Sequence, residues 1–89
     1  MQEIEKLRAD LDEIQAELVS LFRRRLVITQ KIWRIKKSTD LALSDLPREH
    51  AMIHRFDAEI SEEIEQTAVQ NFSKNILSET KKYLEAKLK

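Results

Sequence analysis

A cation occupies one position of an otherwise apolar helical stripe. Arg25 stands between Leu21 and Ile28, where the repeat calls for an apolar residue. Because an unpaired buried guanidinium costs much free energy, we expect Arg25 to face a carboxylate or an anionic ligand. An interhelical ion pair, or an arginine whose head reaches water, is the plainer interpretation. The stripe itself, spaced three and four residues apart, consists of Ile4, Leu7, Leu11, Ile14, Leu18, Leu21, Ile28, Ile32 and Ile35.

Two further cations relate to Arg25 through helix geometry. Lys36 follows it by eleven residues, which brings it to within about 20° of the same face, roughly 16 Å farther along the axis. The two side chains could hold a small dianion if they converge. Arg8 lies about 100° round the axis from Arg25, so it cannot easily reach the same pocket. It could reach the equivalent pocket of a partner chain.

A polar group opens the second predicted helix. Ser44 or Asp45 can cap the helix, since each offers a side-chain oxygen, and Arg48 and Glu49 on composition alone form an ordinary surface pair. His50 and His54 have metal-ligand spacing, but the HExxH pattern is absent and no third ligand is obvious, so we expect no metal site. Without a cysteine or a serine in a recognisable motif, nucleophilic catalysis has little support.

The elements that must position these residues are helices in a single domain, residues 1–89. The chain has no glycine and one proline, which argues against the many tight turns of a β-rich fold. An uninterrupted helix over residues 2–37 would be roughly 50 Å long. A compact domain of this size is only about 30 Å across. The first helix must therefore protrude or lie against another chain.

Two more helices are predicted after a loop at residues 37–44. The second, over about residues 46–59, has Pro47 in its first turn, where a missing N–H costs little. The third, over about residues 62–87, begins after Ser61 with acids in its first turn. Its predicted apolar face consists of Ile64, Ala68, Val69, Phe72, Ile76, Tyr83 and Leu84.

Charge and hydropathy narrow the class of partner. The 16 basic and 16 acidic residues balance, which argues against general nucleic-acid binding. No run of about 18 apolar residues could span a membrane. The first five residues lack the basic start and apolar core of a signal peptide. We therefore expect a cytoplasmic protein with neither nucleic acid nor membrane as its partner.

Short motifs occur in one register along about residues 4–56. They are L-R-x-x-L-D-x-I from Leu7, the leucines at 18 and 21 with R-R-R-L-V at 23–27, I-K at 35–36 and D-L-P-R-E at 45–49. Together they resemble the AroQ class of chorismate mutases. The resemblance implies an intertwined, all-helical homodimer with three helices per chain and two active sites shared between the chains. It also implies the Claisen rearrangement of chorismate to prephenate, toward phenylalanine and tyrosine, with no cofactor.

The resemblance assigns roles to the cations. Arg25 of one chain and Arg8 of the other would hold the carboxylates of the dianionic substrate by bidentate hydrogen bonds. Lys36 would donate to the ether oxygen, where negative charge grows as the C–O bond breaks.

The segment that opens the second helix would complete the site. By the same resemblance, Arg48 would support the carboxylate end of the substrate and the neighbouring acids. Glu49, with the region of Asp45, would hold the ring hydroxyl. Arg25, Lys36 and Glu49 are thus the implied catalytic residues.

The third helix departs from the family pattern, which commonly has S-x-x-x-Q. Alignment on the apolar residues puts Glu79 and Tyr83 at those positions, whereas alignment on the serine gives Ser78 and Lys82. The second choice turns the pair away from the apolar face, so we prefer Glu79 and Tyr83 as substrate-binding residues. Neither choice supplies the glutamine.

Two other functions fit the same pattern. An isochorismate-pyruvate lyase on this fold also needs a lysine and arginine clamp, although Asp45 and Glu49 match the mutase pattern better. The absent glutamine is compatible with a non-catalytic or regulatory helical dimer.

Overall fold

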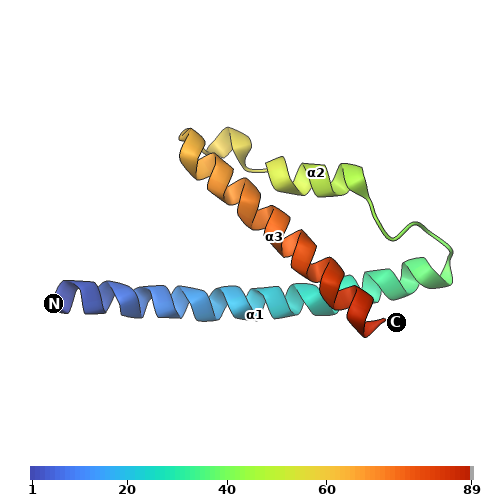
Figure 1. Cartoon of the computed structure of the whole chain (residues 1–89), viewed down its shortest axis with the longest axis horizontal. Helices are drawn as coiled ribbons and strands as arrows, with labels where there is room; N and C mark the ends of the chain where they lie inside the picture. The colour runs from blue at the N-terminus through green and yellow to red at the C-terminus, as the bar shows by residue number, and fades with distance from the viewer. Residues whose placement is uncertain (89) are drawn as a thin grey trace.

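The computed structural model describes residues 1–88 and is all-helical in that range. Three α-helices follow one another, α1 at Gln2–Ser38, α2 at Leu46–His54 and α3 at Glu63–Lys87, with a short 3₁₀ turn, η1, at Asp57–Glu59. In Figure 1, α2 lies above the carboxyl-terminal half of α1 and apart from it, and α3, which packs on both, runs back diagonally until it crosses α1. The predicted fold class, all-α with a long, a short and a long helix, is confirmed.

α1 ends one residue beyond the predicted position. The positive charges of Lys36 and Lys37 in its last turn interact favourably with the negative end of the helix dipole. The Ile35 carbonyl accepts both the Thr39 N–H at 3.1 Å and the Thr39 hydroxyl at 2.8 Å. The Lys36 carbonyl accepts the Leu41 N–H at 2.9 Å, so acceptors of the last turn are satisfied. Asp40 has a φ of 58°, a left-handed conformation in which aspartate is tolerated better than most residues. The chain therefore turns back without a glycine.

α2 begins as predicted but stops earlier. The Asp45 carboxylate accepts the Arg48 N–H at 3.1 Å, so the cap forms as expected. The helix ends at His54 instead of near residue 59, and the chain continues as η1. The Asp57 carbonyl accepts the Ile60 N–H at 3.3 Å within η1 and also a hydrogen bond from the Gln66 side chain of α3 at 2.8 Å, so α3 holds this turn.

The buried side of α3 matches the predicted apolar face only in part: Leu84 is fully buried as predicted, and Val69 and Ile76 are half-buried. Ser73, Thr80 and Leu84 are its buried residues, and the Thr80 hydroxyl is satisfied by the Ile76 carbonyl at 2.6 Å. Phe72, at 49% exposed, is one of several residues of the predicted face that stay open to solvent in the single chain. Two neighbouring helices cover only part of α3, so its remaining apolar surface has nothing to pack against within residues 1–88.

The single chain is too extended to bury a core of its own. Its radius of gyration is 16.6 Å, against about 12 Å for a compact domain of this length. Among residues 1–88, Leu84 is the one large side chain that is fully buried. The amino-terminal half of α1 extends beyond α2 and α3 (Figure 1). The chain therefore offers a long apolar surface to something outside itself.

Candidate active site

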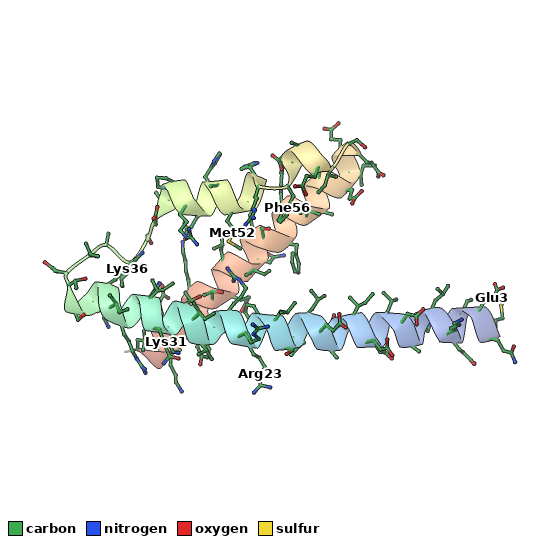
Figure 2. All side chains as sticks on the ribbon, turned by 180° about the vertical axis from the view of Figure 1, so that it is seen from behind. Glu3, Arg23, Lys31, Lys36, Met52 and Phe56 are labelled. Carbon is green, nitrogen blue, oxygen red and sulfur yellow. The ribbon has the colours of Figure 1, made fainter. Side chains whose placement is uncertain are left out.

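Arg25 lies half-buried on α1 and faces α2. Its Nη2 donates to the sulfur of Met52 at 3.7 Å, and its Nη1 is buried without a hydrogen-bond partner among residues 1–88. A thioether is a weak acceptor and carries no charge, so the guanidinium is not neutralised. Met52 lies between α2 and α3 in Figure 2, whereas Arg23 points to the opposite side of α1. This arrangement suits an anion that enters between the helices.

Lys36 lies on the same side of α1, beside the loop that leads to α2 (Figure 2). Its Nζ is 3.5 Å from the Leu43 carbonyl oxygen, the outer limit of a hydrogen bond. It also lines an open hollow of about 520 Å³ whose other residues are Leu41, Ala42, Ser44, Asp45, Leu46 and Pro47. The amine is therefore weakly held and free to take a better acceptor.

Glu49 on α2 pairs with a residue of α3 that the motifs did not indicate. The Nζ of Lys81 lies 2.8 Å from Oε1 of Glu49, and the two side chains are 38% and 20% exposed. Glu49 and Met52 are neighbours one helical turn apart on α2. The pair therefore adjoins the contact between Met52 and Arg25.

A signal for Lys81 was present in the sequence. Leu77, Lys81, Leu84 and Leu88 recur at steps of four, three and four, so Lys81 interrupts an apolar line just as Arg25 does on α1. The alignment of the third helix with the family pattern used other apolar residues, so it did not indicate Lys81.

Three predicted residues stay outside this cluster in the single chain. Asp45 acts as the cap of α2 through the Arg48 N–H, and both residues are exposed. Arg8 is exposed on the part of α1 that extends alone, about 25 Å along the axis from Arg25. Arg25, Lys36 and Glu49 are each half-buried, and Asp45 lines the same hollow as Lys36. Among residues 1–88 no hydrogen bond or ion pair joins these three side chains to one another.

The helix-three candidates point elsewhere. Glu79 is 63% exposed and pairs with Lys82 at 3.3 Å along the helix surface. Ser78 is exposed as well. Tyr83 faces the opposite flank of α3 from Lys81, since their positions differ by about 160° round the helix. None of the four contacts Arg25, Lys36 or Glu49 through an interaction of the described side chains.

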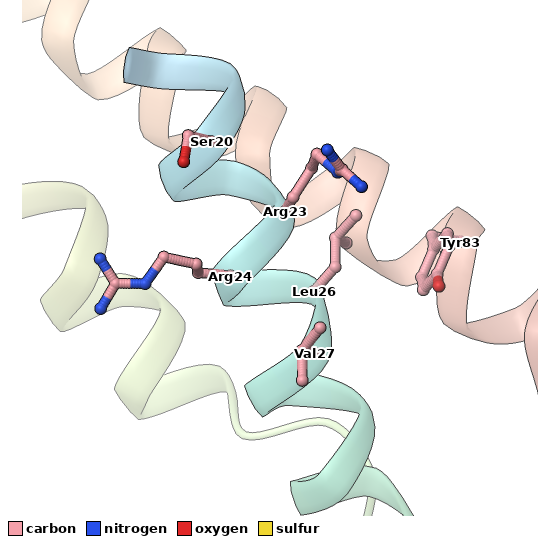
Figure 3. Close-up of a pocket in the computed structure, with 6 residues that line it drawn as sticks. All are labelled: Ser20, Arg23, Arg24, Leu26, Val27 and Tyr83. Atoms are coloured by element: carbon pink, nitrogen blue, oxygen red, sulfur yellow. The ribbon is translucent and has the colours of Figure 1, made fainter. Parts of the chain in front are cut away.

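Tyr83 instead borders a second hollow at the crossing of α1 and α3 (Figure 3). This hollow has a volume of about 460 Å³, and its lining residues are Ser20, Arg23, Arg24, Leu26, Val27 and Tyr83. The guanidinium groups of Arg23 and Arg24 point apart in Figure 3. Because the cations diverge over an apolar floor, the hollow is poorly arranged to hold a small anion.

A polar cluster joins the end of α2 to α3. His54 Nδ1 lies 2.8 Å from one carboxylate oxygen of Asp57, and Gln70 donates to the other at 2.9 Å. The hydrogen bond from Gln70 lowers the pKa of Asp57 most, and the hydrogen bond from His54 lowers it next, so this pKa lies below its usual range. His50 stacks on His54 with ring centroids 4.5 Å apart. Within residues 1–88, no three His, Cys, Asp or Glu side chains form a group that could hold a metal ion.

The fold and this geometry define an all-helical domain with an unneutralised arginine at the meeting point of its helices. The model of the family described as chorismate mutase type II matches residues 7–85, and the chain belongs to this family. No curated protein and no solved structure matches the chain. In the described part of the chain, no helix is both long and apolar enough to cross a bilayer.

Proposed function

We propose that the chain is a chorismate mutase that converts chorismate to prephenate in the cytoplasm, at the branch toward phenylalanine and tyrosine. The reaction breaks the ether C–O bond and forms a C–C bond within one molecule, so no second reactant is needed. The observation that carries the proposal is the buried Nη1 of Arg25, which lacks a partner among residues 1–88. A substrate carboxylate would supply both the acceptor and the counter-charge. Membership of the family supports the same reaction.

Each side chain of the cluster has a task in this reaction. Arg25 binds a substrate carboxylate and fixes the reactive conformer, which lowers the entropic part of the barrier. Lys36 leaves the Leu43 carbonyl, its present 3.5 Å contact, and donates to the ether oxygen as negative charge develops there. Glu49 accepts the hydrogen bond of the ring hydroxyl. No proton transfer is required of any of them.

We also propose that a partner chain completes each site, in an intertwined homodimer. Arg8 of the partner would supply the second guanidinium, since it lies too far from Arg25 of its own chain. The first half of α1 supports this, because its apolar stripe is open to solvent, with Leu7 and Leu11 each 62% exposed. A sustained heptad-like stripe suits helix pairing.

The residues at the start of α2 form the entrance to the site in this proposal. Asp45 lies on the hollow that Lys36 also lines. It would help Glu49 with the ring hydroxyl, and Arg48 would support the carboxylate end of the substrate.

The test compares two arginines of α1. Arg25→Ala should lower kcat/KM for chorismate by about a thousandfold, the scale of losing a buried charged donor to the transition state. Arg23→Ala is the matched control, because Arg23 is exposed and points away from α2, and should leave the rate within about twofold. Circular dichroism checks that both variants are helical. Normal turnover by Arg25→Ala would overturn the assignment.

A second assay distinguishes a chorismate mutase from an isochorismate-pyruvate lyase on the same fold. Offered isochorismate, a mutase should release little pyruvate, whereas rapid pyruvate release would favour an isochorismate-pyruvate lyase. One observation favours the non-catalytic dimer: neither alignment of α3 places a glutamine at the last position of the S-x-x-x-Q pattern. Binding of a bicyclic transition-state analogue together with chorismate turnover would exclude it.

A further inference from the structure

We propose that Lys81 is a positioning residue of the substrate site: it neutralises and orients Glu49, so that the site can include its own carboxylate beside a dianionic substrate. The inference deepens the proposed function and rests on it.

The geometry places Lys81 where it can do this. Its Nζ reaches from α3 to Oε1 of Glu49 at 2.8 Å, and Glu49 is the less exposed partner at 20%. A lysine with three donors can hold one carboxylate oxygen and leave the other free to accept a hydroxyl. The contact also sets the rotamer of Glu49 before any ligand arrives, which reduces the entropy lost on binding.

The ion pair between Lys81 and Glu49 also affects the net charge that the substrate meets. A lone carboxylate near the ring hydroxyl would repel the two carboxylates of the substrate. With Lys81 present, the Glu49 pair is neutral, and the two cations of α1 are left to meet a dianion. The net charge of this cluster is then +2, from three cations and one carboxylate. Without Lys81 it falls to +1, and the missing charge is the one closest to Glu49.

The first experiment measures KM and kcat for chorismate in Lys81→Met. We expect KM to rise roughly tenfold with kcat within about twofold, because the repulsion acts on bound substrate and transition state alike. Lys81→Arg should recover most of the loss, since it restores the charge. Lys82→Met is the matched control, because Lys82 is 69% exposed and pairs with Glu79 away from the site. An unchanged KM in Lys81→Met overturns the proposal.

A double-mutant cycle separates positioning from direct contact. In a Glu49→Gln background there is no carboxylate to neutralise, so Lys81→Met should then change KM by no more than about twofold. A full tenfold effect in that background overturns the proposal, because Lys81 would act on the substrate itself or on the fold. If Lys81→Met loses helicity, Lys81→Gln replaces it with the same expectations, as it keeps a donor to Glu49 but no charge.

A binding measurement keeps this inference distinct from the proposed function. Calorimetry with a bicyclic dicarboxylate analogue of the transition state needs no turnover. Wild-type protein that neither binds the analogue nor consumes chorismate would remove the proposed function itself. Wild-type protein that binds it, with Lys81→Met binding equally well, would remove only the role of Lys81. Weaker binding by Lys81→Met, recovered in Lys81→Arg, supports the inference.

Discussion

The two halves of α1 carry one continuous stripe and meet different surroundings. In the carboxyl-terminal half, α2 and α3 lie on the side of α1 that carries Arg25 and Lys36, and both cations are half-buried there. The apolar residues of the stripe stay open in this half too, with Ile28 57% and Ile35 61% exposed. In the amino-terminal half nothing within residues 1–88 covers the stripe, and Leu11 is 62% exposed. The comparison teaches that the chain's own helices partly bury the two cations of α1, whereas the apolar stripe remains an open face along both halves.

Disrupting the amino-terminal half should have the largest effect. Leu11→Asp places a charge in the centre of the open stripe and should prevent pairing of the chains, because a desolvated unpaired charge is very costly. Since one chain buries so little, we expect loss of cooperative unfolding and of all chorismate turnover, with a monomeric mass in light scattering. Glu13→Ala, on the opposite side of α1, is the control and should remain a fully active dimer. A folded, active Leu11→Asp monomer would contradict the interpretation of this half as a docking face.

A change at Arg25, in the carboxyl-terminal half, should affect stability and activity in opposite directions. Arg25→Met replaces an unneutralised cation by an apolar side chain next to Met52, so we expect a rise of a few degrees in Tm. The same change should lower kcat/KM for chorismate by about a thousandfold, the loss expected for Arg25→Ala. Thermal unfolding followed by circular dichroism, with a chorismate assay on the same sample, measures both. A fall in Tm would mean that Arg25 is a structural ion-pair residue after all.

The cluster at the end of α2 should give the smallest effect, and one that depends on pH. Because the pKa of Asp57 is lowered in the folded state, the cluster stabilises the fold above the unfolded pKa of about 4. That contribution is lost as the pH falls through the lower, folded value. Gln70→Leu removes the largest cause of the shift, so its Tm should lie below that of the wild type at pH 7. The difference should shrink below about pH 4; an equal difference at both pH values would contradict this role.

The spacing of apolar residues along one helix predicted features that lie within that helix. Features that depend on contacts between helices were not predicted. The periodicity of α1 gave its bounds to within one residue and identified Arg25 as misplaced. The end of α2 at His54 was not predicted from its own residues, and the turn that follows is held by a contact from Gln66 of α3 to the Asp57 carbonyl. The sequence marks Lys81 as a cation in an apolar line, but its partner, Glu49, lies 32 residues earlier in the chain and could not be paired with it from the sequence. The role of Arg8 stays a prediction, because it needs a second chain.

The central claim is that each site joins Arg25 of one chain to Arg8 of another, and mixing two inactive variants tests it directly. Arg8→Ala and Arg25→Ala homodimers should each be nearly inactive. After they are unfolded together and refolded in equal amounts, half of the dimers should be mixed, and each mixed dimer should hold one intact site. We predict recovery of roughly a quarter of the wild-type activity, as random pairing of two chains requires. If the mixture is no more active than its parents, the shared site is contradicted.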